Sequence, residues 1–371
     1  MSRTVRFSLV LLMVSVLVFG TASCSMLKNL GNDTTSTPCD WTLDRLAAQV
    51  VVVPVDQSDL AAGESAVAAG AGGILLFGKT PSNIRVKIAD LVKHAPKGDM
   101  PLVMADQEGG AVQRLSGLVS KLNSARWMAD HWSTEKIQGT SRVLGGQMKE
   151  LGVTMDLAPV LDLDAQATAP NSMNADGNRS FGIDPVKTTR AGLAFARGLQ
   201  DAGVTPVVKH FPGLGGTVGN TDDRPAHTLP WEQLQKAGVR PFKAAIDAGM
   251  PAVMTANASV PGLTDLPASI SPEVMKYLRQ QLGFKGMIIT DSLSAKALLD
   301  SGYSPQKAVV AALKAGADML LYGTSGVSVS EYGSVTAATV EAVNQGQLTR
   351  ERLVQAVNAV RAVKHLGACG S

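Results

Sequence analysis

Residues 204–210 read VTPVVKH, an apolar run that ends in Lys209 and His210. Short, nearly continuous apolar runs of this kind are typical of parallel strands that are buried on both faces. A glycine-rich segment, FPGLGGTVG, follows directly at residues 211–219. We therefore predict a buried strand that carries two polar side chains to its carboxyl end, where a long loop begins.

Seven further runs share this character, and amphipathic segments separate them. The runs are VVVPV (51–55), GGILLFG (72–78), PLVMAD (101–106), VTMDLAPVLDL (153–163), PAVMTAN (251–257), GMIITD (286–291) and DMLLYG (318–323). Two of the amphipathic segments, 184–203 and 271–284, begin with Asp-Pro or Ser-Pro, which signals a helix start. Residues 349–367 predict a closing helix.

Eight β/α units predict an α/β fold, a single (β/α)8 barrel over residues 39–371. A doubly wound open sheet is the alternative, but no G-x-G-x-x-G motif follows a strand. In such a barrel the carboxyl ends of the strands share one rim, where active sites lie. Five of the eight predicted strands end in polar groups, which are Asp106, Asp162, Lys209 with His210, Asn257 and Asp291. We expect this rim to bind a polyhydroxylated molecule.

Asp291 is the sharpest catalytic candidate because it follows the run GMIIT directly and should stand at the mouth of the barrel. An isolated Asp before Ser could instead cap a helix. Arg114 and Arg179 are candidate substrate clamps, since a guanidinium offers a planar set of donors. For each of them a surface ion pair is the alternative. Glu108 could orient a clamp or cap a turn, and no role is assigned to it.

The loop KHFPGLGGTVGNTDDRPAH (209–227) ends in a histidine that has two acidic neighbours, Asp222 and Asp223. A carboxylate beside an imidazole suits it to proton transfer near neutral pH. No Cys/His spacing indicates a zinc site, and no G-x-S-x-G motif indicates a serine hydrolase. The chemistry predicted from these residues requires no metal or organic cofactor.

Residues 1–23 predict a secretory signal, with a basic start, an apolar run from Phe7 to Phe19 and small residues before Cys24. We expect Cys24 to be lipidated and residues 24–38 to form a flexible tether; cleavage and plain secretion is the alternative. The chain would then be a monomer in the cell envelope, held at the membrane by its lipid anchor only. The net charge of +3 shows no basic face for nucleic acid.

Two more cysteines, Cys39 and Cys369, lie at the two ends of the predicted barrel. An exported protein meets an oxidising compartment, so we predict a disulfide between them, with two free thiols as the alternative.

The segments DQEGGAVQRL, APVLDLD, NRSFG, KHFPGLGGT and GFKGMIITDSLS together resemble glycoside hydrolase family 3, in particular its bacterial exo-β-N-acetylglucosaminidases. The resemblance covers the whole mature chain and implies the barrel fold. It implies that Asp291 is the catalytic nucleophile. It also implies sugar-binding roles at positions Asp106, Arg114, Arg179, Lys209 and His210.

The resemblance also implies a histidine acid/base, held by an Asp on the loop after the fifth strand, and here the sequence departs from the family. That loop usually reads KHFPGHGDT followed by Asp-x-His, whereas this chain has Leu214, Gly216 and no Asp-x-His. We expect His227 to be the acid/base and Asp223 its partner, on a loop that can fold over the site.

These features together predict a retaining exo-β-N-acetylglucosaminidase that acts on muropeptides in cell-wall turnover or recycling. Three alternatives stay open: a non-catalytic sugar-binding lipoprotein, a β-glucosidase of the same family, and a phosphorylase that uses phosphate as the acceptor.

Overall fold

The computed structural model describes residues 38–217, 219–322 and 330–368. The predicted signal, Cys24, nearly all of the tether and Cys369 therefore lie outside the described residues. Within the described part, eight parallel strands form one sheet in the order β10-β1-β2-β3-β6-β7-β8-β9. Ile289 and Met319 form a parallel bridge that joins the two ends of this order. The sheet thus closes into a barrel, and the predicted (β/α)8 fold is confirmed.

Each of the eight predicted runs corresponds to one barrel strand, and β1 and β7 extend one residue beyond their runs. The strands are β1 (Val51–Asp56), β2 (Gly73–Phe77), β3 (Leu102–Ala105), β6 (Met155–Asp156), β7 (Thr205–Phe211), β8 (Ala252–Thr255), β9 (Met287–Thr290) and β10 (Leu320–Leu321). Strand β6 is short because Pro159 follows and lacks the N–H group that a central strand donates. The run continues beyond it as an irregular segment, in which the Leu161 N–H donates to the Lys209 carbonyl.

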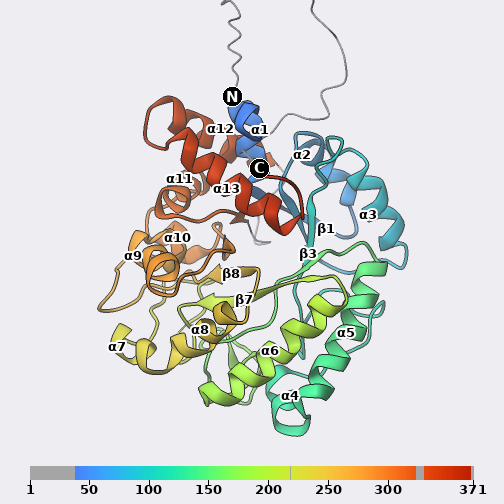
Figure 1. The fold of residues 1–371 in the computed structure, drawn as a ribbon, viewed down its shortest axis with the longest axis vertical. Coiled ribbons are helices and arrows are strands. Elements are labelled where there is room, and N and C mark those ends of the chain that lie inside the picture. The colour runs from blue at the N-terminus through green and yellow to red at the C-terminus, as the bar shows by residue number, and fades with distance from the viewer. Residues whose placement is uncertain (1–37, 218, 323–329, 369–371) are drawn as a thin grey trace, which may run out of the picture. The chain divides into compact units, whose positions relative to one another are not determined.

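Helices lie around the strands (Figure 1). They are α1 (Leu43–Gln49), α2 (Glu64–Ala68), α3 (Ile84–Val92), α4 (Ala125–His131), α5 (Thr134–Glu150), α6 (Pro185–Asp201), α7 (Trp231–Gln233), α8 (Val239–Asp247), α9 (Pro272–Lys276), α10 (Lys296–Asp300), α11 (Pro305–Ala315), α12 (Ser330–Asn344) and α13 (Arg350–Val363). The predicted starts at 184 and 271 are confirmed, because the Asp184 and Ser271 side chains cap α6 and α9. A small hairpin of β4 (Gln107–Gly109) and β5 (Val112–Gln113) was not predicted.

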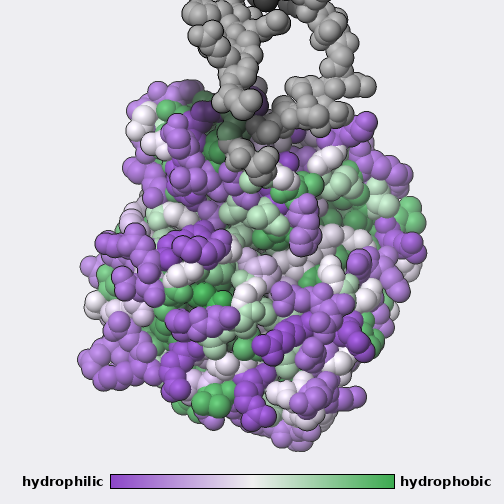
Figure 2. Space-filling view, viewed as in Figure 1, coloured by the Kyte–Doolittle hydropathy of each residue, from purple (hydrophilic) through white to green (hydrophobic). Residues whose placement is uncertain are grey.

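The apolar core has an inner and an outer part. The inner cluster consists of inward side chains from all eight barrel strands, many of them methionine, with Val360 and Val363 of α13. The outer clusters lie between the strands and the helices. On the face that Figure 2 shows, hydrophilic residues alternate with smaller apolar groups. No helix within the described ranges is both long and apolar enough to span a bilayer.

Cys39 is disulfide-bonded. Because Cys24 and Cys369 lie outside the described residues, the pairing of Cys39 with Cys369 stays a prediction.

Candidate active site

A pocket of about 520 Å³ opens at the carboxyl ends of the barrel strands. Side chains from three strand ends line it: Asp106 after β3, Lys209 and His210 in β7, and Asp291 after β9. Arg114 and Arg179 also line it. The structure therefore brings together the residues that sequence analysis assigned to sugar binding and the predicted nucleophile.

A buried ionic network forms one wall of this pocket. Lys209 Nζ lies 2.7 Å from Asp106 Oδ1 and 2.7 Å from Glu108 Oε1. Arg179 donates from Nε and Nη2 to the two oxygens of Glu108, both at 2.8 Å. Burial alone would raise the pKa of Glu108, but Arg179 and Lys209 outweigh it and hold that pKa far below its usual range. Glu108 is thus a fixed anion that orients two cations.

Lys209 stays charged in this network. Burial alone would lower its pKa, but Asp106 and Glu108 raise it above the usual value. The Asp106 side chain is 20% exposed, against 3% for the Lys209 side chain. Asp106 can therefore accept a bond from a ligand hydroxyl while Lys209 holds it in place.

A second buried pair supports His210. Its Nδ1 lies 2.6 Å from Asp162 Oδ2. The same carboxylate accepts from the backbone N–H groups of His210 and Leu214. Because the Asp162 carboxylate accepts hydrogen bonds, Nδ1 of His210 carries the hydrogen. In a neutral imidazole Nε2 is then the acceptor nitrogen. Burial lowers the pKa of His210 to about 4, so its imidazole is neutral at neutral pH.

Asp291 stands at the end of β9, where its N–H donates to the Thr255 carbonyl. Its Oδ1 accepts from the N–H of Ser292 at 2.7 Å. The next helix, α10, begins at Lys296 with Ala295 as its N-cap, so Asp291 does not cap it. Burial raises the pKa of Asp291 and the charge of Asp222 adds to that rise, whereas the N–H of Ser292 and the charge of Lys209 oppose it. The carboxyl group is placed to act on a ligand rather than to close a helix.

His227 and Asp223, the expected acid/base pair, are not among the residues that line this pocket. Both are exposed. The backbone on either side of His227 is tied to Ser259, whose N–H donates to Ala226 and whose carbonyl accepts from Thr228. This pairing holds the histidine on a segment beside the pocket. Its neighbour on the loop, Asp222, lines the pocket instead.

Two other rim residues have separate positions. Arg114 is exposed and lines the pocket, with its own N–H donating to the Asp106 carbonyl. Asn257 is buried and donates to the Ser292 carbonyl at 2.7 Å, while it accepts from Ser269. Asn257 therefore supports the turn after Asp291 from behind.

One group of described residues could offer ligands to a metal ion, namely Asp162, Asp176 and His210, with atoms within 4.8 Å of one another. Asp162 and His210 already bind each other. The positive charge of Arg179 acts to lower the pKa of each of these three residues, and the same charge would repel a cation bound between them. This group is better suited to orient His210 than to hold a metal.

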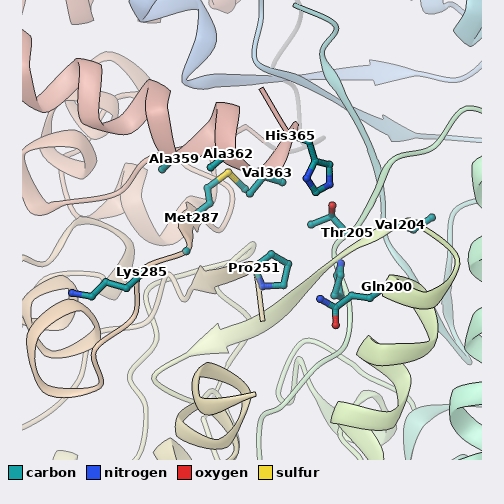
Figure 3. Close-up of a pocket in the computed structure, with 13 residues that line it drawn as sticks. Gln200, Val204, Thr205, Pro251, Lys285, Met287, Ala359, Ala362, Val363 and His365 are labelled. Atoms are coloured by element: carbon teal, nitrogen blue, oxygen red, sulfur yellow. The ribbon is translucent and has the colours of Figure 1, made fainter. Parts of the chain in front are cut away.

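A second pocket, of about 360 Å³, lies at the opposite end of the barrel (Figure 3). Its wall includes Thr205 and Met287, which begin β7 and β9, and Val363 and His365 at the end of α13. No carboxylate is found among its lining residues, all of which belong to the described part of the chain. Of these two pockets, only the one at the carboxyl ends of the strands offers carboxylates that could act as catalytic groups.

Sequence reasoning left two pocket residues without a role of their own. Glu108 lies in the quoted segment DQEGG, and a buried Glu between two cations could have been suspected from its position next to a predicted strand end. Asp222 and Asp223 are adjacent in the loop, and only the path of the folded backbone determines that Asp222 lines the pocket and Asp223 does not.

Comparison with known proteins agrees with this architecture. The glycosyl hydrolase family 3 N-terminal domain matches residues 42–363. Beta-hexosaminidase LpqI of Mycobacterium tuberculosis is 34% identical over 332 residues, covering 86% of this chain and 82% of LpqI. The solved structure of M. tuberculosis LpqI superimposes with a TM-score of 0.80 at 33% identity, covering 89% of this chain and 96% of that one.

A further solved structure, a beta-N-acetylhexosaminidase from Beutenbergia cavernae, gives a TM-score of 0.80 at 28% identity and covers 88% of this chain and 99% of that one. The family match spans nearly all of the barrel and includes every residue that lines the pocket. The chain belongs to glycosyl hydrolase family 3 and is a glycoside hydrolase.

Proposed function

We propose that this glycoside hydrolase removes terminal β-linked N-acetylglucosamine from glycans, with retention of the anomeric configuration. The observation that carries the proposal is that Asp291 shares one pocket with the Asp106–Lys209 pair and the Glu108–Arg179 pair. A carboxylate nucleophile beside donors and acceptors for sugar hydroxyls is the arrangement that retaining glycosidases need. The names of the β-hexosaminidase relatives support the choice of sugar.

In the proposed reaction, an oxygen of Asp291 attacks the anomeric carbon and the bond to the leaving oxygen breaks, while an acid protonates that oxygen. Water then attacks the same carbon and gives its proton to the conjugate base, and the bond to Asp291 breaks. Asp106, Lys209 and His210 hold the hydroxyls of the sugar. Arg114 and Arg179 lie beside them.

We further propose that the natural substrates are peptidoglycan fragments and that the chain works in the cell envelope. This proposal rests on the sequence, where a predicted secretory signal and a run of small residues precede Cys24. A Cys24→Ala variant should lose its lipid label and leave the membrane fraction. Membrane association that persists without the label would contradict the anchor.

The test of activity is hydrolysis of p-nitrophenyl N-acetyl-β-D-glucosaminide by the wild type, by Asp291→Asn and by Asp300→Asn. Asp300 pairs with Lys296 at the surface and serves as the matched control. We expect Asp291→Asn to lose at least about 10³-fold in kcat/KM and the control to keep its rate. NMR of the first product should show the β anomer. Preference for the corresponding glucoside would favour a β-glucosidase, and binding of the sugar by an inert wild type would favour a binding protein.

A further inference from the structure

The loop that carries Asp222 is fixed on both sides of the pocket. On one side the N–H of Gly219 donates to the Met173 carbonyl at 3.1 Å. On the other side the Thr221 carbonyl accepts from the N–H of Ala297 at 3.0 Å, just after the turn that follows Asp291. Thr221 is itself 6% exposed. Asp222, the next residue, is thereby held on the rim of the pocket that contains Asp291.

The two carboxyl groups influence each other. Burial raises the pKa of Asp222, Arg179 opposes that shift, and the charges of Asp223 and Asp106 add to it. Asp222 in turn raises the pKa of Asp291. Two carboxyl groups in one pocket resist being ionised together, so one can hold a proton while the other is an anion.

The remaining titratable groups of the pocket cannot supply this proton. They are Asp106, Glu108, Arg114, Arg179, Lys209 and His210. Asp106 and Glu108 are bound as anions to Lys209, whose raised pKa keeps it charged. Arginine does not give up its proton in proteins. His210 is neutral, and its Nδ1 is bound to Asp162.

We propose that Asp222 is the catalytic acid/base of this pocket, in the place that sequence analysis assigned to His227. This inference rests on the proposed function. The Asp222 carboxyl group gives its proton to the glycosidic oxygen as the bond from that oxygen to the anomeric carbon breaks and the bond to Asp291 forms. The resulting carboxylate takes a proton from water as that water attacks the anomeric carbon and releases Asp291. The enzyme returns to its starting state, with a protonated Asp222 and an ionised Asp291.

The experiment compares the wild type with Asp222→Ala, with Asp223→Ala as the matched control and with His227→Ala as the competing candidate. Asp223 is the adjacent carboxylate; both side chains are exposed, but only Asp222 lines the pocket. Two substrates with the same sugar are used, N,N′-diacetylchitobiose and 2,4-dinitrophenyl N-acetyl-β-D-glucosaminide. The first needs a proton on its leaving group and the second does not.

For Asp222→Ala we expect kcat/KM on chitobiose to fall by about 10²–10⁴-fold. The loss on the dinitrophenyl substrate should be much smaller. Sodium azide should raise the turnover of that substrate and give the β-glycosyl azide, because the small anion can occupy the space of the missing carboxylate. Asp223→Ala and His227→Ala should keep the wild-type ratio of rates on the two substrates and show no azide effect, although the loss of the Asp223 charge lowers the pKa of Asp222. Circular dichroism checks that each variant is folded, and Asp222→Asn provides an isosteric second variant.

Two results would overturn the assignment of Asp222 alone. One is an active wild type whose Asp222→Ala and Asp222→Asn variants lose equal factors on both substrates without an azide effect. The other is azide rescue in His227→Ala. A wild type that is inert on both substrates would overturn the proposed function, and the role of Asp222 with it.

Discussion

Removing the charge of Glu108 should destabilise the fold far more than its position on a pocket wall suggests. Its carboxylate binds Arg179 through two hydrogen bonds of 2.8 Å and Lys209 at 2.7 Å. In Glu108→Gln, Lys209 keeps its bond to Asp106. Arg179 loses its negatively charged partner and one of the two acceptor oxygens, while its side chain is only 15% exposed. Leaving one member of a buried ion pair uncompensated costs about 3–5 kcal/mol. We expect the free energy of unfolding to fall by that amount.

The pH dependence of this loss follows from the pKa of Glu108, which is lowered from its usual 4.5. A lowered pKa means that the carboxylate stabilises the folded state above pH 4.5. That contribution disappears only as the pH falls through the lower value in the folded protein. The difference between the wild type and Glu108→Gln should therefore be constant from pH 6 to 8 and shrink below about pH 4.

Guanidinium unfolding followed by circular dichroism measures this difference, with Glu232→Gln as the control. Glu232 forms an i,i+4 pair with Lys236 whose two side chains are 79% and 71% exposed. An exposed pair of this kind is worth at most about 1 kcal/mol. If the two substitutions change the unfolding free energy equally, the ionic wall of the pocket does not stabilise the fold as argued.

Three further predictions concern single residues. Burial raises the pKa of Asp176 from 3.8 to about 8, and neither of its carboxylate oxygens has a hydrogen-bond partner. The protonated form is therefore preferred in the fold, and Asp176→Asn should become progressively more stable than the wild type as the pH rises from about 4 to 8 in urea unfolding. A side chain at Gly215 would place its Cβ 1.7 Å from the Leu163 carbonyl oxygen, so Gly215→Ala should displace the loop and lower kcat/KM, whereas Gly146→Ala, which meets open space, should not. In the Asp222→His variant, the alkaline limb of the pH–rate profile should lie at higher pH than in the wild type, because imidazole is the weaker acid.

The barrel could be predicted from the sequence because each strand lies in a nearly continuous apolar run. Each such run can be recognised from its own residues, without knowledge of the rest of the fold. The rim residues Asp106, Lys209 and Asp291 followed from the same reasoning, since a residue at the carboxyl end of a barrel strand must face the rim. The acid/base was harder to place. Asp222, Asp223 and His227 lie on a loop without periodicity, and long-range bonds to Met173, Ser259 and Ala297 determine which of them faces the pocket. A short-range pattern carries no information on such bonds.

A carboxylate at position 222 also predicts which acceptor completes the reaction. With Asp222 ionised and Asp291 bound to the sugar as an ester, the pocket carries three carboxylates (Asp106, Glu108 and Asp222) against three cations (Arg114, Arg179 and Lys209).

A phosphate dianion that attacks the anomeric carbon must pass the acid/base, and at about 4 Å each pair of unit charges costs about 1 kcal/mol even with the screening of bulk water. Neutral water has no such cost. We therefore expect the wild type to release free sugar at equal rates in phosphate and in a phosphate-free buffer. Asp222→His, which removes one negative charge, should form some sugar 1-phosphate in phosphate buffer, detectable by phosphorus NMR. Sugar 1-phosphate from the wild type would mean that the group facing the leaving oxygen is not an anion when the acceptor arrives, and Asp222 could not then be the base.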